Sequence, residues 1–103
     1  MSEASHYVYI LRSLSRADCY YVGQTSDVAR RLSEHNSGKS KHTAKYRPWE
    51  LSAYIGFPDL PRALNFERYL KSGSGRAFAK RHFLQGGGNF RLPKPVVVFV
   101  WKR

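Results

Sequence analysis

Residues 6–35 read HYVYILRSLSRADCYYVGQTSDVARRLSEH, and this stretch decides the fold. Residues 6–12 are mostly β-branched and aromatic, which predicts a strand. A polar turn over 13–18 separates them from a second apolar run over 19–24. The two runs therefore predict a β-hairpin at the start of the chain.

A helix is expected directly after this hairpin. Ser26 and Asp27 offer an N-cap and a first-turn acid. Four residues follow at spacings i, i+3, i+4 and i+7, which is the period of a helix: Val28, Arg31, Leu32 and His35. The polar Asn-Ser-Gly run at 36–38 ends the pattern.

The remaining chain predicts one more strand in the middle, two helices, and a strand at the end. Residues 39–48 form a basic loop, and apolar residues then alternate over 49–57, as in a strand with one apolar face. Asp59 caps a helix from Leu60 to about Lys71, which Ser72-Gly73 ends. Ser74 or Gly75 opens a further helix that reaches Gln85. Val96–Trp101 is the last strand, and its partner is not evident from the pattern.

This order of elements predicts an α+β (mixed α/β) fold, with a small, largely antiparallel sheet of three to four strands flanked by three helices. At 103 residues we expect a single domain over 1–103. A lone cysteine, Cys19, excludes an internal disulfide and a Cys-based zinc site. The longest apolar run, 96–101, is too short to cross a bilayer, and no signal peptide is evident. We expect a cytoplasmic protein that does not bind membranes.

The charge points to a polyanionic partner. Lys and Arg number 18 against 7 Asp and Glu, a formal net charge of +11. Glu67 is the last acidic residue, so 68–103 contains no carboxylate. Basic side chains displace condensed counterions from a phosphate backbone, which favours nucleic acid. A basic structural or ribosome-associated protein is the alternative that charge alone leaves open.

Glu67 is the most informative acidic residue. It lies on an expected helical stripe otherwise made of Leu60, Ala63, Leu64 and Leu70. A carboxylate on an apolar stripe must be paired, protonated or bound to a cation. Mg²⁺ suits a site with one carboxylate, substrate phosphate and waters. An ordinary i, i+4 ion pair with Lys71 is an equal alternative.

Arg31 and His35 share the apolar face of the first helix. The guanidinium could clamp a phosphate with two hydrogen bonds, or its stem could cover the edge of the core. His35 could move a proton, hold the attacking water, or be a packed core residue. On the helical pattern alone, the structural interpretation is favoured for each residue.

The hairpin carries the other candidates. Tyr7 and Tyr9 share one face of the first strand, and Tyr21 and Gly23 share one face of the second. A tyrosine acts as general base only if positive charge or a metal lowers its pKa, and aromatic cross-strand packing is the simpler alternative. Gly23 in a strand indicates close approach by a backbone or ligand.

Together these residues resemble the GIY-YIG nuclease superfamily. Tyr7-Val8-Tyr9 is similar to the first half-motif, with Tyr7 in place of its glycine, and Tyr21-Val22-Gly23 is similar to the second. Arg31 and His35 follow in the family's order, and Glu67 falls on its metal-binding glutamate. The similarity covers Tyr7 to Lys71 and is greatest to the short, single-domain bacterial members; residues 74–103 would add a basic helix and a strand. Asn89 is the one asparagine that could match a further family position.

The resemblance implies a metal-dependent endonuclease, with DNA favoured over RNA and a role in DNA repair. Its catalytic residues would be Tyr9, Tyr21, Arg31, His35 and Glu67, with Glu67 holding Mg²⁺ or Mn²⁺. Tyr46 and Trp49 could stack on an unpaired base, although core packing suits Trp49 better. A nucleic-acid-binding module without cleavage is the alternative, and a partner protein or a homodimer could direct the enzyme to its target. The residues expected to bind nucleic acid are Gly23, Lys39, Lys41, Lys45, Arg47, Lys71, Arg76, Lys80 and Arg81.

Overall fold

Four strands form one sheet in the computed structural model, which describes residues 4–16, 18–84 and the backbone of 96–99. The strands are β1 (His6–Ser13), β2 (Tyr20–Thr25), β3 (Trp49–Phe57) and β4 (Val96–Phe99), in the order β2-β1-β3-β4. β1 pairs antiparallel with β2 and β3, whereas β4 pairs parallel with β3. The α+β prediction is confirmed, and β3 is the partner that the pattern did not name.

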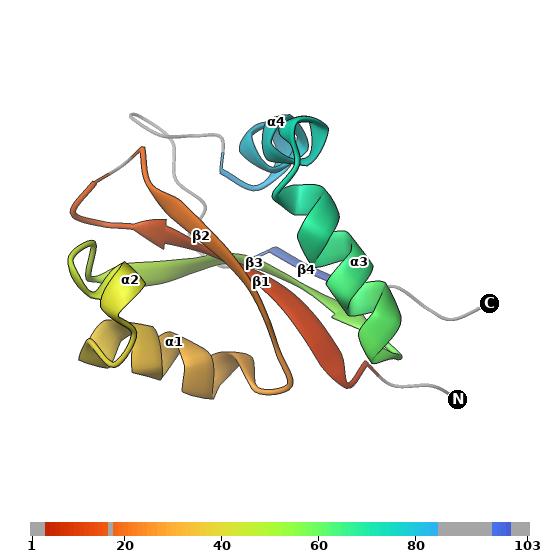
Figure 1. Ribbon diagram of the computed structural model, residues 1–103, viewed down its shortest axis with the longest axis horizontal. Helices are drawn as coiled ribbons and strands as arrows, with labels where there is room; N and C mark the ends of the chain where they lie inside the picture. Colours follow the sequence, from red (N-terminus) through yellow and green to blue (C-terminus); the bar gives the residue numbers. More distant parts are fainter. Residues whose placement is uncertain (1–3, 17, 85–95, 100–103) are drawn as a thin grey trace.

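Helices cover both faces of this sheet (Figure 1). α1 (Val28–Ser37) and the short α2 (Lys41–Ala44) lie on one side, and α3 (Leu60–Leu70) and α4 (Gly73–His82) on the other. The expected basic loop over 39–48 was therefore wrong in part, because α2 forms inside it. A four-residue helix is too short to show a periodic pattern, and its backbone bonds start from the Ser40 carbonyl.

The helix starts are set by side-chain caps. Asp27, not Ser26, is the N-cap of α1 and accepts from the Arg30 backbone N–H at 3.0 Å. Asp59 caps α3 as predicted. Ser72, expected to end the preceding helix, is the N-cap of α4, so α4 starts earlier than predicted. It also ends at His82, whereas the prediction extended it to Gln85. Cap residues and helix breakers are the same residue types, so sequence alone confuses them.

The hydrophobic core has two parts because side chains of a strand alternate between faces. On the α3 face, aliphatic side chains of β1 and β3 pack against Ala63, Leu70 and Phe83. On the α1 face, an aromatic cluster forms around Tyr9, Leu11 and Trp49. We call these the aliphatic core and the aromatic core.

The expected apolar stripe of α3 was wrong in phase. Leu60 and Leu64 are 41% and 39% exposed. Ala63 and Leu70 are buried as predicted, and Phe66, which was not in the expected stripe, packs beside them. Glu67 consequently lies beside the buried stripe and not in its middle. The i, i+4 spacing of the apolar residues is compatible with two neighbouring faces of the helix, and the sequence did not distinguish them. No helix in the described ranges is long and apolar enough to span a membrane.

Candidate active site

A chain of hydrogen bonds links Tyr9, His35 and Thr43 beneath α1 and α2. The Tyr9 hydroxyl lies 2.9 Å from His35 Nε2, and His35 Nδ1 lies 2.8 Å from Thr43 Oγ1. Thr43 in turn donates to the Ser40 carbonyl. Because the Thr43 hydroxyl proton is donated to the Ser40 carbonyl, we assign the proton of the neutral imidazole to Nδ1, which donates to Thr43 Oγ1. The unprotonated Nε2 then accepts from the Tyr9 hydroxyl. All three side chains are buried.

Gly23 makes the position of Tyr9 possible. The two residues are cross-strand partners in β1 and β2. A Cβ at Gly23 would overlap the Tyr9 hydroxyl and lie 2.6 Å from its Cζ. The phenol thus lies flat over the glycine, which supplies the close approach that a strand glycine indicates. The approaching group is a side chain of the same domain.

Tyr21 lies at the outer side of this pair. Its ring centroid is 4.8 Å from that of His35 and 6.1 Å from that of Tyr9. It is half-buried, whereas Tyr9 is 1% exposed. The two tyrosines therefore differ in surroundings: Tyr9 is enclosed and hydrogen-bonded, and Tyr21 borders solvent.

The pKa values of Tyr9 and His35 are shifted in opposite directions. Burial raises the pKa of Tyr9, and the neighbouring Arg31 opposes that rise. Burial lowers the pKa of His35, and the positive charge of Arg31 lowers it further. At neutral pH Tyr9 is a neutral phenol and His35 a neutral imidazole. Tyr9 is thus not ionised in the free protein, and His35 is the group able to accept its proton.

Arg31 is held beside the pair by an ion pair. Its guanidinium lies 2.6 Å from Glu34 one helical turn onward, and that hydrogen bond raises the pKa of Arg31. The same bond lowers the pKa of Glu34. Both side chains are partly exposed, so an incoming phosphate can compete with Glu34 for the guanidinium.

Glu67 comes from α3, across the sheet from α1. Its carboxylate lies 3.0 Å from Lys71 Nζ, which is the i, i+4 pair that the sequence allowed. Its side chain is 20% exposed, and Lys71 is 55% exposed. The negative charge of Glu67 adds a small contribution to the raised pKa of Tyr9, after burial and Tyr21, so the two side chains lie within electrostatic range of each other.

Glu67 offers a single oxygen donor for a cation. Within the part of the chain that the structure describes, no three His, Cys, Asp or Glu side chains are grouped as a metal site. One carboxylate suits Mg²⁺ or Mn²⁺, which retain waters and bind substrate phosphate, and does not suit zinc. The donor chemistry therefore fits the expected ion with Glu67 as its protein ligand.

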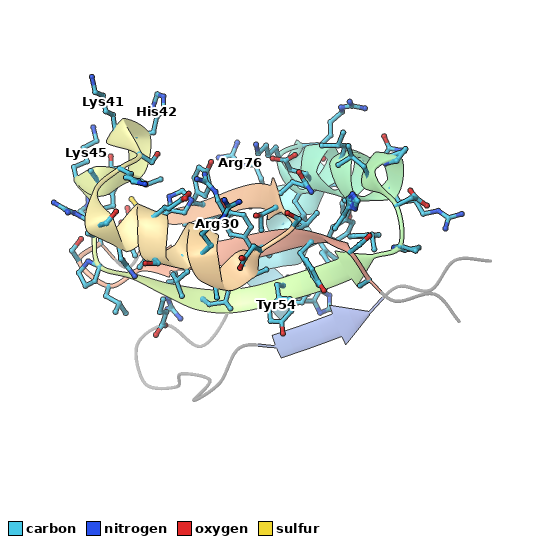
Figure 2. All side chains as sticks on the ribbon, turned by 90° about the horizontal axis from the view of Figure 1, so that it is seen from below. Arg30, Lys41, His42, Lys45, Tyr54 and Arg76 are labelled. Carbon is cyan, nitrogen blue, oxygen red and sulfur yellow. The ribbon has the colours of Figure 1, made fainter. Side chains whose placement is uncertain are left out.

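The expected nucleic-acid-binding cations form two groups, one around α2 and one along the end of α3 and α4. Lys39, Lys41, Lys45 and Arg47 surround α2, and all are exposed. Lys71, Arg76, Lys80 and Arg81 are exposed along the end of α3 and along α4. Figure 2 shows Lys41, His42 and Arg76 projecting toward the same side, where the edge strand β2 lies. The side of the molecule at which β2 lies therefore carries exposed positive charge.

The structure thus brings Tyr9, Tyr21, Arg31 and His35 together, and it places Glu67 within electrostatic range from the opposite helix. Thr43 was not foreseen, because a threonine in a basic loop carries no signal of its own. Trp49 is buried, and its indole N–H donates to the Thr43 carbonyl, as expected of a core residue. Asn89 lies outside the described residues.

Comparison with known proteins assigns the family. Residues 5–92 match the GIY-YIG catalytic domain. The chain belongs to the GIY-YIG family. A UPF0213 protein of Halalkalibacterium halodurans is 38% identical over 84 residues, which cover 81% of this chain and 87% of that protein. The solution NMR structure of a UPF0213 protein from Bacillus halodurans aligns with a TM-score of 0.46 at 36% identity, over 80% of this chain and 86% of the other.

Larger relatives share the domain. The structure-specific endonuclease subunit slx1 of Talaromyces stipitatus is 46% identical over 65 residues, which are 57% of this chain and 17% of that protein. The equivalent subunit of Chaetomium globosum is 44% identical over 70 residues, 62% of this chain and 22% of that protein. The chain therefore spans about a fifth of the length of these relatives, and the similarity is that of a small, single GIY-YIG domain.

Proposed function

We propose that this domain is a metal-dependent endonuclease that hydrolyses phosphodiester bonds, with DNA as its substrate in preference to RNA. The observation that carries the proposal is the buried Tyr9–His35 hydrogen bond beside Arg31. Membership of a catalytic-domain family and relatives named as endonuclease subunits support a nuclease. A packed core has no need of a phenol, an imidazole and a guanidinium gathered in one place.

The Tyr9–His35 hydrogen bond supports a path for one proton in the proposed reaction. As water attacks the phosphorus, its proton moves to the Tyr9 oxygen, while the Tyr9 hydroxyl proton moves to His35 Nε2. His35 becomes an imidazolium whose Nδ1–H remains bonded to Thr43. The tyrosine never has to exist as a free phenolate, which its raised pKa disfavours. His35 later returns its proton to solvent, and the leaving oxygen takes one from solvent.

The charged residues stabilise the phosphate. Arg31, released from Glu34, would donate hydrogen bonds to non-bridging oxygens, where negative charge develops in the transition state. Glu67 would hold Mg²⁺ or Mn²⁺, which when bound supplies a Lewis acid toward a phosphate oxygen. Lys71 would then leave the Glu67 carboxylate and bind the phosphate backbone of the substrate.

The two groups of exposed cations would position the nucleic acid. One group surrounds α2, and the other lies along the end of α3 and α4. Contacts of this kind fix the register of the backbone and carry no sequence information. Because slx1 relatives are named as subunits, we also propose that a partner protein or a second copy directs the domain to its target, in DNA repair among other settings. The working compartment in this proposal is the cytoplasm.

One observation favours a second candidate, a nucleic-acid-binding module without cleavage. In the free protein Arg31 and Glu67 are both ion-paired to neighbours on their own helices. If substrate does not exchange these partners, the domain binds and does not cut. The two candidates differ in metal dependence and in their response to removal of the Glu67 charge.

The test is cleavage of labelled DNA and RNA oligonucleotides with Mg²⁺, with Mn²⁺ and with chelator. We expect cleavage that needs the metal and falls about a hundredfold or more in Glu67→Gln. Glu50→Gln on β3 is the matched control and should cleave as the unmodified protein does. Binding without metal-dependent cleavage by the unmodified protein would establish the binding module instead.

A further inference from the structure

A cavity of about 500 Å³ adjoins the candidate active site. β2 supplies its floor through Tyr20, Tyr21 and Val22. His42 and Thr43 of α2 line one side, and Leu70 at the end of α3 and Arg76 of α4 line the other. Tyr21 and Thr43 line the cavity and also contact His35, so the cavity opens beside the Tyr9–His35 pair.

The charged groups of the cavity favour an anionic ligand. His42 of α2, Lys71 at the end of α3 and Arg76 of α4 line it, and all three are exposed. Figure 2 shows His42 and Arg76 projecting toward the same side of the molecule. The one carboxylate among the lining residues, Asp18, lies 3.9 Å from Arg16, which offsets its charge. A phosphate entering this cavity meets Lys71 and Arg76 on the α3–α4 wall and the His42 imidazole on the α2 wall.

The aromatic groups favour a flat ligand. Tyr20, Tyr21 and Tyr46 line the cavity, and each is half-buried, so part of each ring remains accessible. Trp49 is also present, but it is buried and held by its indole hydrogen bond to Thr43. Tyr46 packs edge-on against Trp49 at a centroid distance of 6.3 Å, which fixes its ring. Lys45 Nζ and Arg16 Cζ lie over the same ring, 5.3 and 5.7 Å from its centroid, so a stacked base would displace one of these flexible side chains.

Aromatic faces beside cations are the arrangement that holds unpaired bases, which stack on the rings while basic groups follow the backbone. The volume is that of a pocket for one small ligand. We infer that this cavity holds a single unpaired nucleotide of the substrate, adjacent to the phosphate at the Tyr9–His35 pair, with Tyr46 as a stacking platform and Arg76 as a backbone contact. The inference rests on the proposed nuclease function and names its substrate class, nucleic acid that is unpaired next to the cleaved bond.

A binding measurement tests the pocket without needing cleavage. Fluorescence anisotropy in chelator, at one fixed salt concentration, compares the full chain on a blunt duplex, a duplex with a single-stranded flap, and a single strand of the same sequence as DNA and as RNA. We expect the flap and the single strand to bind about tenfold more tightly than the blunt duplex. The RNA strand shows whether the pocket accepts a ribose 2′-hydroxyl.

Two pairs of variants assign the preference to the cavity. Tyr46→Leu should remove most of the preference for unpaired strands, and Tyr46→Phe, which keeps the ring, should retain it. Arg76→Ala should weaken flap binding more than Arg81→Ala, which removes the same charge on α4 away from the cavity. The quenching of 2-aminopurine at the unpaired position reports stacking directly and should be lost in Tyr46→Leu only.

Equal binding of blunt duplex and flap by the unmodified protein would overturn the inference, as would equal effects of Tyr46→Leu and Tyr46→Phe. Either result leaves metal-dependent cleavage of duplex free to occur, so the proposed function would stand. Conversely, a preference for unpaired strands in a protein that never cleaves would keep the pocket and refute the nuclease.

Discussion

The two faces of the sheet are built from the same strands, yet they differ in chemistry. On the α3 face, Val8 and Ile10 are fully buried among aliphatic and phenylalanine side chains. On the α1 face, Tyr9 is equally buried but bonds to His35, which bonds to Thr43. The aliphatic core stabilises by excluding water. In the aromatic core each buried polar group needs its partner, so stability and the proposed catalysis would depend on the same atoms.

The strongest way to separate the faces is to change adjacent residues of β1. Tyr9→Phe removes one hydroxyl and should lower the cleavage rate about 10²- to 10⁴-fold, because the proton path is cut. Ile10→Ala, on the opposite face, should lower the free energy of unfolding by about 2–5 kcal/mol through a cavity in the aliphatic core. The rate per folded molecule should stay near that of the unmodified protein.

Thermal unfolding and cleavage, measured for both variants well below their Tm values, check this contrast. Tyr9→Phe also leaves His35 Nε2 without its partner, which costs about 1–3 kcal/mol. A Tyr9→Phe protein that cleaves at the normal rate would show that the pair is structural. An Ile10→Ala protein that is folded but inactive would show that the two faces are not separable.

Gly23→Ala tests the same face through packing. The added methyl would occupy the space of the Tyr9 ring, so the phenol must shift away from His35. We expect a tenfold to hundredfold loss of cleavage, smaller than for Tyr9→Phe because the hydroxyl is displaced and not removed. In the background of Tyr9→Phe, Gly23→Ala should lower the rate little further, because both changes act on one hydrogen bond.

A double-variant cycle on cleavage rates measures that coupling. Additive losses would mean that Gly23 acts on substrate directly, as a point of close approach by the nucleic-acid backbone, and not through Tyr9. Gly38 provides a contrast elsewhere in the chain: its φ of 88° requires a glycine for backbone reasons at the end of α1.

Local patterns were sufficient for the elements and insufficient for the contacts between them. The strands and α1 could be predicted from residue type and hydrophobic period, and Asp59, as an N-cap residue, indicates the start of α3. The phase of α3 could not be predicted, because Leu60 and Leu64 look apolar enough to be buried and are not. Which leucines are buried depends on how a helix lies on the sheet, and that is decided by residues far away in sequence.

The candidate site shows the same division. Tyr9, Tyr21, Arg31, His35 and Glu67 were found because their order matches a family. The bond from His35 to Thr43 was not, because α2 brings the threonine back to α1 in a turn too short to show a period. The Lys71–Glu67 pair was foreseen as a possibility, since i, i+4 spacing is local. The cavity over β2 was beyond prediction, because three separate segments line it.

The smallest expected effect is on the pH dependence of the aromatic core. Burial holds the pKa of His35 below its usual value near 6.5. The imidazole must be neutral to accept the Tyr9 proton, so cleavage should rise with pH below about 6.5 and level off above it. Because the folded pKa is the lower one, the unfolded chain binds more protons in that range, and stability also falls as pH drops below about 6.5. Between pH 7.5 and 6.0 the rate should fall less than about fourfold. Rates at fixed ionic strength, compared with those of His35→Gln, measure this acidic limb. If the limb persists unchanged in that variant, or lies above pH 7, His35 does not receive the proton, and the α1 face would need another base.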